Sequence, residues 1–537
     1  MKLSALVGRV YPMVQEEQKR VLEDTERVSG KTALRNNVEA AVALSGAVQS
    51  TLGPKGLDKL LVGSDGTSLV TNDGVTVLET ALVEHPTAKM LISTSRAQDD
   101  ETKDGTTSTV ILTAELLVNA LELVERGVHP TIIANGYRLC DPVVEKLLSE
   151  ISIEADENAR LDAVLTSLSG KGDEGMRQCL AKLAHAAALA IGSNDTEHCR
   201  IITQCSGTIL DSEIVQGIVL EKSRVHREMS KRHEGGRVLI LDGGIERRKP
   251  EIDATLQITK IGALDAFNQR EREDLQRRVD LLKDAGIDLV ITRDGIEEDA
   301  HPMLADAGII AYRRVERPEI EHICRATGAR PLHTLDDIEE IDIGEFAGLR
   351  EEKWLGSTHM ILQGAKEEAV TVVLRGSTES RLGEARRAFD DALGVACQMT
   401  EEPRLLPGGG ATQIALARRL RRHAETIPGR EQMAVEAFAA ALESIPRILA
   451  TNAGMDPIDE LLRATAAQAD ANSAWKGLDI RSGEIVDMGE SGITEPLRIT
   501  RHAIAGATEA AVSVLRIDDI LWAKQDAQEP DWKTDEH

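Results

Sequence analysis

The sequence predicts a multidomain protein of the α and α/β classes, with a mostly helical domain built from both chain ends and an α/β part inserted between them. The chain has 537 residues, which suggests about three domains at roughly 150 residues each. Both ends are rich in alanine at helical spacing, whereas the middle holds short β-branched or aliphatic runs separated by charged helical stretches. Hydrophobic residues make up 42% of the chain and aromatic residues 2%, so the cores must be sizeable and aliphatic.

The first 150 residues are predicted to form helices around a segment rich in Gly and Asp. Leu34, Val38, Ala41 and Val48 fall on one face of a helix, which ends before the breaker cluster Thr51–Gly56. Two short strands are expected around 59–62 and 68–71, and a second helix over 107–126 with Gly127 at its C-terminal cap.

The middle of the chain is expected to alternate strands and helices. The strand-like runs are 237–241, 289–292, 309–312 and 370–374. Between them, residues 267–283 predict a long solvated helix with a thin apolar stripe of Leu275, Val279 and Leu282. Beyond Pro403, the helices expected are 411–425, 432–452, 457–470 and 502–515.

The charge and cysteine content exclude several classes of protein. A formal net charge of −27 argues against a general nucleic-acid binder, which needs a basic face. No stretch is expected to span a membrane, because the longest uncharged run, Ala40–Pro54, is too short. The six cysteines lack CxxC spacing and are expected to be reduced thiols in a cytoplasmic protein.

Three segments have the composition of phosphate-binding loops, and each has an ordinary alternative. Glycines in Thr51–Gly56 let backbone N–H groups approach an anion. Asp104–Ser108 opens a helix, where free N–H groups favour an anion and Asp104 could hold Mg²⁺; it could equally be a plain helix start with Asp104 or a hydroxyl as N-cap. Gly408–Gly410 precedes another helix and suggests a close approach to the backbone, or simply a flexible loop.

Two further carboxylates and one decoy complete the candidates. Asp73 follows a strand-like run and could be a plain turn aspartate, while Asp391 is on a predicted helix where acidic pairs usually face solvent. Composition alone assigns neither a role. Ser29–Thr32 looks like the end of a P-loop, but Thr25 stands where that motif needs glycine and no clear strand precedes it.

Taken together, these motifs closely resemble the group II chaperonins, the family of the archaeal thermosome and its eukaryotic cytosolic relatives. The resemblance spans roughly residues 31 to 520. The motifs that carry it, in chain order, are Thr51–Lys59, Thr71–Gly74, Asp104–Thr107, Lys249–Ala254, Ala307–Ala311, Arg313–Val315, Arg325–Ala329, Leu374–Gly376, Gly408–Gly410, Glu495–Arg498 and Leu515–Asp519.

The resemblance implies a chaperonin fold with three domains per subunit. The equatorial ATPase domain would comprise residues 1–152 and 403–537, the small α/β intermediate domain 153–222 and 369–402, and the α/β apical domain 223–368. The apical domain would bind unfolded substrate and carry a helical protrusion at about 252–285, which acts as a built-in lid. Subunits of this family form two stacked rings, usually of eight, from one or several kinds of subunit.

The resemblance also implies a site for ATP, Mg²⁺ and a monovalent cation such as K⁺. Asp73 and Asp391 would position and polarise the attacking water, and Asp104 would hold Mg²⁺. Backbone oxygens around Thr51 and Asn72 could take the monovalent cation. The nucleotide would contact Leu52, Gly53, Pro54, Gly105, Thr106, Thr107, Ser108, Lys171, Gly409, Leu478, Ile480 and Glu495.

Several departures from the family pattern suggest a divergent archaeal paralogue. Lys103 replaces the usual Gly and could strengthen anion binding, or crowd the loop if the position needs a glycine conformation. Gln413 and Arg386 stand where Glu is common. The resemblance predicts an ATP-driven folding chamber for unfolded proteins; the alternative is a weakly active structural or holdase paralogue that co-assembles with another subunit.

Overall fold

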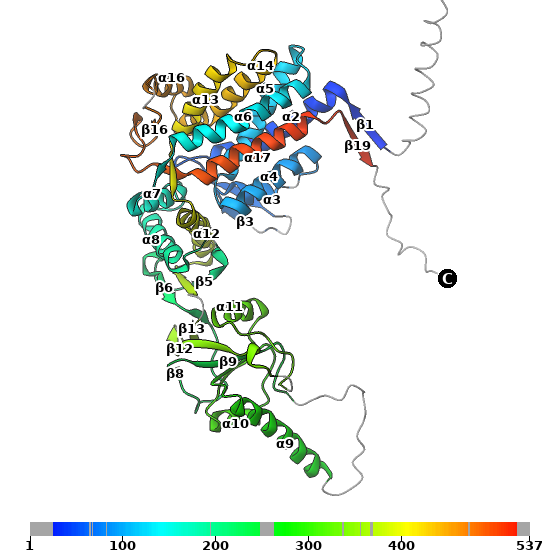
Figure 1. Cartoon of the computed structure of the whole chain (residues 1–537), viewed down its shortest axis with the longest axis vertical. Coiled ribbons are helices and arrows are strands. Elements are labelled where there is room, and N and C mark those ends of the chain that lie inside the picture. Colours follow the sequence, from blue (N-terminus) through cyan, green and yellow to red (C-terminus); the bar gives the residue numbers. More distant parts are fainter. Residues whose placement is uncertain are drawn as a thin grey trace, which may run out of the picture. The chain divides into compact units, whose positions relative to one another are not determined.

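The computed structural model describes residues 25–63, 66, 68–81, 83–193, 195–246, 263–335, 338–354, 356–365, 369–470 and 473–523. The chain divides into two compact units (Figure 1). We call residues 1–170 with 404–537 the terminal unit, and residues 171–403 the inserted unit. The first and the last described segments of the chain, 25–63 and 473–523, therefore belong to one body, as the nested pattern predicted. The finer division into five domain segments stays a prediction.

The terminal unit is mostly helical. Its helices are α2 (Gly30–Val48), α3 (Gly74–Thr80), α4 (Pro86–Thr102), α5 (Thr106–Glu125), α6 (Pro130–Ile151), α7 (Glu157–Ser167), α13 (Ala411–Ala424), α14 (Glu431–Leu442), α15 (Ser444–Asn452), α16 (Pro457–Ala467) and α17 (Leu497–Leu515). Helix α5 packs against α2, α4, α14 and α17, which places its aliphatic side chains at the centre of the core. Among the described helices, only α5 has the length and hydropathy to cross a membrane, and most of it is buried in this core.

Short strands join the two ends of the chain within the terminal unit. Strand β1 (Thr25–Ser29) pairs antiparallel with β19 (Asp519–Ala523), and β2 (Lys59–Val62) forms a hairpin with β3 (Ser68–Thr71). In a three-stranded sheet, β15 (Arg404–Pro407) lies between β18 (Thr494–Pro496) and β4 (Ile153–Glu154). Strands β16 (Lys476–Asp479) and β17 (Glu484–Asp487) form another hairpin.

The inserted unit contains two sheets. Strand β14 (Val370–Arg375) lies between β5 (Cys199–Gln204) and β6 (Glu213–Gln216), beside α8 (Glu174–Ile191) and α12 (Glu379–Glu401). The larger sheet has the order β11-β10-β9-β12-β13-β7, with β8 paired to β12. Its strands are β7 (Ile218–Leu220), β8 (Arg232–His233), β9 (Gly236–Leu241), β10 (Leu289–Thr292), β11 (Ile310–Tyr312), β12 (Gly344–Trp354) and β13 (Ser357–Gly364).

Three helices accompany this larger sheet: α9 (Ala263–Asp284), α10 (Ala300–Asp306) and α11 (Arg317–Thr327). The predicted apolar stripe is confirmed, because Leu275, Val279 and Leu282 of α9 are buried in a core with the strands. The part of the predicted protrusion before α9, residues 247–262, lies outside the described residues.

Several details of the predicted secondary structure were wrong or missing. Strand β1 does precede the Ser29–Thr32 segment, and the helices α4 and α6 were not predicted. The helix predicted over 432–452 is two helices, α14 and α15, which meet at Glu443 close to Pro446. Helix α17 begins at Leu497 rather than His502. The long β12–β13 hairpin was missed, because the charged residues near its tip hide the strand pattern.

Candidate functional site

Helix α5 begins with the features of an anion-binding site. Gly105 is its N-cap residue, in the left-handed conformation at φ 80°, and no side chain in the described residues caps the helix there. The alternative reading of Asp104 as the N-cap is therefore wrong; Asp104 precedes the cap, and its Oδ1 accepts a 2.7 Å bond from the Gly105 N–H. Thr106, Thr107 and Ser108 occupy the first turn. Their N–H groups point along the helix axis, where the helix dipole favours a negative charge.

A buried glutamine behind this loop was missed by the sequence analysis. Gln98 of α4 is fully buried, and its Nε2 donates to the backbone oxygen of Asp104 at 2.9 Å. The hydroxyl of Thr102 donates to the same oxygen, also at 2.9 Å. The position of the Asp104 backbone is therefore set by two side chains of the preceding helix.

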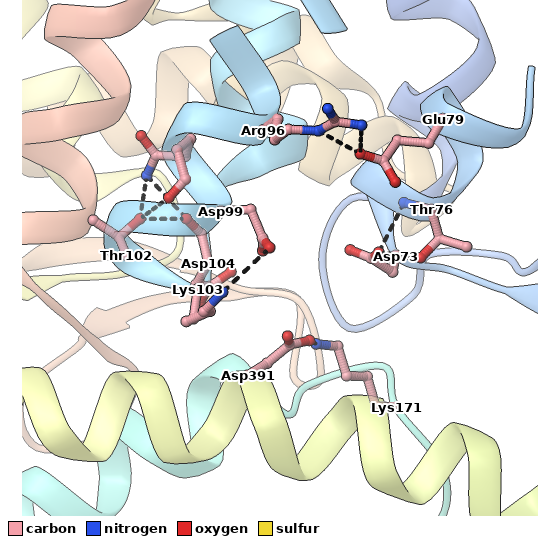
Figure 2. A network of polar contacts seen from close by, with 11 residues as sticks. Asp73, Thr76, Glu79, Arg96, Asp99, Thr102, Lys103, Asp104, Lys171 and Asp391 are labelled. Atoms are coloured by element: carbon pink, nitrogen blue, oxygen red, sulfur yellow. Dashed lines mark hydrogen bonds and ion pairs between the residues drawn. The ribbon is translucent and has the colours of Figure 1, made fainter. Parts of the chain in front are cut away.

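Lys103 occupies a position that needs a glycine conformation. Its φ of 54° is left-handed, and Arg314 is the one other described residue besides glycine with positive φ. Such a conformation costs a residue with a Cβ roughly 1 kcal/mol. The Lys103 ammonium lies 3.7 Å from a carboxylate oxygen of Asp99 (Figure 2). Burial raises the pKa of the Asp99 carboxyl, and the nearby Asp73 adds to that rise, while Lys103 opposes it.

Asp73 lies beside the start of α5. Its Oδ2 accepts bonds from the backbone N–H and the hydroxyl of Thr76, at 2.9 and 2.6 Å, so it is the N-cap of α3 (Figure 2). Gly74 approaches α5 so closely that a Cβ there would lie 2.5 Å from the Thr107 hydroxyl oxygen. The structure thus brings the Asp73 turn and the predicted phosphate-binding residues together.

The Thr51–Gly56 loop adjoins the same region. Gly53 has a left-handed φ of 82°, and a Cβ there would lie 2.4 Å from the side chain of Leu449 and 4.0 Å from that of Ile480. The Leu52 carbonyl accepts a 2.9 Å bond from the Asn452 amide. This loop therefore needs glycine for packing against the chain itself, in addition to any ligand.

Asn72 ties this loop region to the end of the terminal unit's first segment. Its amide donates to the Gly170 carbonyl at 3.0 Å, and Gly170 approaches both Gly53 and Pro54. Thr51 is buried at the start of the loop. Asn72 is thus linked through Gly170 to the loop that begins at Thr51, the other residue assigned to the monovalent cation.

The triple glycine is explained by its neighbours. A Cβ on Gly409 would meet the Leu478 carbonyl oxygen at 2.7 Å, and one on Gly410 would meet the Pro446 side chain at 2.6 Å. The Leu478 N–H donates to the Gly409 oxygen at 3.2 Å. The predicted close approach to this backbone is therefore real, and it is made by the protein itself. It also places the residues predicted beside the adenine, Leu478 and Ile480, next to the glycines and the Gly53 loop.

Glu495 lies at the end of β18, just before α17. Its Oε1 accepts a 2.7 Å bond from the Thr500 hydroxyl. The residue keeps some accessible surface, but the carboxyl is surrounded by protein atoms. This burial raises the pKa of Glu495 to about 7; the Asp104 carboxylate contributes to the rise, while hydrogen bonds from Thr500 and Gln413 oppose it. Gln413, a departure from the family pattern, can donate a hydrogen bond to the Glu495 carboxyl, whereas a glutamate carboxylate at this position would repel it.

The two remaining predicted residues pair with each other in the inserted unit. The Lys171 ammonium forms an ion pair with Asp391 Oδ2, and their side chains are 18% and 19% exposed (Figure 2). Lys171 precedes α8, and Asp391 projects from α12. Arg386 is exposed on the same helix, and nothing in the structure explains its replacement of glutamate.

The carboxylates fit Mg²⁺ only together with a phosphate ligand. No group of three His, Cys, Asp or Glu side chains arranged for a metal occurs in the described parts of the chain. Mg²⁺ is usually held by one or two carboxylates plus phosphate oxygens and waters, so a full protein cage is not needed. Asp104 beside an open helix N-terminus is such a donor.

Comparison with known proteins identifies the family to which the chain belongs. The model of the TCP-1/cpn60 chaperonin family matches residues 44–525. Among curated proteins, a thermosome subunit of Methanopyrus kandleri is 41% identical over 514 residues, covering 94% of each chain. Thermosome subunit beta of Archaeoglobus fulgidus is 43% identical with the same coverage, and thermosome subunit 1 of Haloferax volcanii is 43% identical over 93% of this chain and 90% of its own.

The chain therefore belongs to the TCP-1/cpn60 chaperonin family. Its similarity to thermosome subunits over nearly its whole length makes it a group II chaperonin, a molecular chaperone that acts in protein folding. The fold class and the family predicted from the sequence are confirmed.

Proposed function

We propose that this chaperonin binds ATP with Mg²⁺ in its terminal unit, and that hydrolysis drives the enclosure and folding of unfolded proteins. The observation that carries the proposal is the start of α5, where free N–H groups, three hydroxyl residues and Asp104 converge beside the Asp73 turn. A nucleoside triphosphate with Mg²⁺ fits this site, because the N–H and hydroxyl donors can bind the phosphates and the single carboxylate can hold the metal.

The roles assigned by resemblance are part of this proposal. Gly105–Ser108 would bind the phosphates, the Leu52–Pro54 loop would cradle the nucleotide, and Asp104 would hold Mg²⁺, which when bound neutralises phosphate charge. On the other side, Gly409 and Glu495 would contact the ribose, with Leu478 and Ile480 near adenine. Leu478 and Ile480 are buried and aliphatic, as an adenine-facing surface requires.

Two aspartates are proposed to prepare the attacking water. Asp73 Oδ2 accepts both bonds from Thr76, so we assign Oδ1 to the water. Asp391 would polarise the same water, and Lys171 would sense the γ-phosphate. Backbone oxygens around Thr51 and Asn72 would bind K⁺.

We further propose a cytoplasmic assembly of two stacked rings, usually of eight subunits, that receives unfolded protein clients. The terminal unit has surfaces suited to assembly, because the β2–β3 hairpin exposes Leu60, Val62 and Val70, and Leu521 of β19 is also exposed. Two-stranded sheets leave open edges that readily pair with another chain. The weakly active holdase alternative is not favoured by the match to thermosome subunits, and all three aspartates are present.

The experiment is Mg²⁺-dependent phosphate release from ATP by the purified protein and by Asp104→Asn. The variant should lose about 100-fold or more of the rate, because the metal-holding charge is removed. Asp100→Asn is the matched control, because Asp100 is exposed on α4, four residues before Asp104, and it should keep the wild-type rate. Equal rates in Asp104→Asn and wild type would contradict the proposed site.

A further inference from the structure

We propose that Gln98 is a positioning residue of the nucleotide site, whose side-chain amide holds the Mg²⁺-phosphate loop at a fixed place relative to the helix that follows Glu495. The inference rests on the proposed function, since it names a residue that fixes two segments of that site relative to each other. Gln98 is not itself assigned to the nucleotide or the metal; it acts through backbone atoms of Asp104 and Ile499.

The amide of Gln98 spans two segments that are distant in sequence. Its Nε2 lies within hydrogen-bond distance of three oxygens: the Thr102 hydroxyl at 2.7 Å, the Asp104 carbonyl at 2.9 Å and the Ile499 carbonyl at 3.3 Å. The two protons of the amide are shared among them. Asp104 ends the loop before α5, whereas Ile499 lies in the first turn of α17, four residues beyond Glu495. One buried NH₂ group thus joins the phosphate end of the site to its ribose end.

The orientation of this amide is determined by its partners. Carbonyl oxygens only accept, so the atom facing Asp104 and Ile499 must be the nitrogen. On the other side, Oε1 lies 2.7 Å from Nδ1 of His502, which must therefore carry a proton. Because each group has one compatible role, the side chain cannot flip without leaving buried atoms unpaired.

The loop is also shaped to accept this side chain. A Cβ on Gly105 would lie 3.0 Å from Gln98 Nε2 and 2.8 Å from the Ile499 side chain. Position 105 therefore requires glycine for two reasons: the N-cap is left-handed, and the Gln98 amide lies in close contact with it. If the amide is removed, the Asp104 carbonyl keeps the Thr102 hydroxyl, while the Ile499 carbonyl loses the donor that links it to the loop.

A second buried glutamine offers a matched control. Gln468 is almost fully buried, and its Nε2 donates to the carbonyls of Ala411, Ala474 and Lys476, at 3.0, 3.4 and 2.7 Å. The chemistry is the same, but these partners lie beside the triple glycine and β16, away from the Asp104 loop. Replacement by Met keeps the shape and removes the donors in either case.

The experiment measures ADP affinity with and without Mg²⁺ in the full-length protein, for wild type, Gln98→Met and Gln468→Met. The ratio of the two affinities is the Mg²⁺ gain, a binding readout that needs no turnover. We expect Gln98→Met to lower this gain about tenfold, since a misplaced Asp104 cannot hold the metal against the phosphates. Gln468→Met should retain the gain, whatever it does to overall ADP affinity.

A milder variant keeps the inference testable should Gln98→Met fold poorly. His502→Leu removes the bond that orients the amide while Gln98 stays in place, and the Mg²⁺ gain should fall about threefold. An unchanged gain in a folded Gln98→Met or in His502→Leu, or an equal loss in Gln468→Met, would overturn the inference. A wild-type protein that binds no ADP would instead contradict the proposed function.

Discussion

The two compact units hold their proposed site residues by different kinds of interaction. In the terminal unit, the loops are held by neutral hydrogen bonds and by glycines packed against neighbouring atoms, as at Gly53, Gly105 and Gln98. In the inserted unit, Asp391 is held by a charged partner, Lys171. Buried hydrogen bonds between neutral groups fix the geometry and respond little to a nearby charge. A carboxylate in an ion pair can instead exchange its partner for another charged group.

This difference suggests a division of labour. Under the proposed function, the terminal unit would be organised in advance for nucleotide binding, and the inserted unit would keep its catalytic carboxylate neutralised by Lys171. Nucleotide binding and hydrolysis should therefore be separable by mutation, and the predictions below test that separation.

The largest expected effect is at Asp391. Asp391→Ala should lower the rate of ATP hydrolysis about 100-fold or more, because a group that polarises the water is lost, while ADP affinity and assembly stay near wild type. Phosphate release and equilibrium ADP binding measure the two effects. The control is Asp390→Ala, an exposed neighbour on the same helix, which should keep its turnover; normal turnover in Asp391→Ala would sink the assignment.

The second effect concerns Glu495 and pH. Its pKa is raised to about 7 in the folded protein from an ordinary value of 4.5, so the folded state binds the proton more tightly than the unfolded one. This contribution to stability is full below pH 4.5 and is lost as the pH rises to about 7, by up to about 3 kcal/mol.

Glu495→Gln should therefore gain stability relative to wild type as the pH increases across that window. Urea unfolding of both proteins at pH 5 and pH 8 measures the difference. If the two unfolding midpoints keep the same separation at both pH values, the carboxyl does not titrate as proposed.

A smaller effect is expected at the ion pair of the inserted unit. Lys171→Met leaves the largely buried Asp391 carboxylate without its charged partner, and should cost about 1–2 kcal/mol of unfolding free energy. Arg35→Met in the terminal unit breaks the 2.6 Å pair with Glu125, whose side chains are 59% and 52% exposed, and should cost less than about 0.5 kcal/mol. Equal losses of unfolding free energy in Lys171→Met and Arg35→Met, measured by urea unfolding, would contradict the difference between the buried and the exposed pair.

The smallest effect is expected at Lys103. Lys103→Gly relieves a left-handed φ of 54° and should stabilise the protein by about 0.5–1 kcal/mol, since glycine adopts this region without a Cβ clash. Thermal unfolding measures the change. A destabilised variant would show that the Lys103 ammonium near Asp99 adds more to the free energy of unfolding than the left-handed backbone of Lys103 takes away.

The local geometry of several candidate site segments could be predicted because their residues are adjacent in sequence. The Asp104–Ser108 start of α5 and the Asp73 turn are continuous segments with characteristic residues, and the alternative that Lys103 occupies a glycine-like position is confirmed. The helices α2, α5 and α13 and the strands β2 and β3 were predicted for the same reason, as their residue spacing is also local in sequence.

Gln98 could not be predicted, because a glutamine at one helical position resembles any solvated residue. Its importance comes from partners some four hundred positions away, at Ile499 and His502, which only the fold brings together. Likewise, helical spacing does not reveal the break between α14 and α15 at Glu443, a residue that is buried and paired with Arg421.

The central claim is that ATP drives this chaperonin to fold its clients. The most direct measurement is the yield of active enzyme recovered when an unfolded client is incubated with the purified protein, with Mg-ATP compared with Mg-ADP. The account predicts a clearly higher yield with Mg-ATP than with Mg-ADP. Capture of the client with equal recovery under both nucleotides would contradict it.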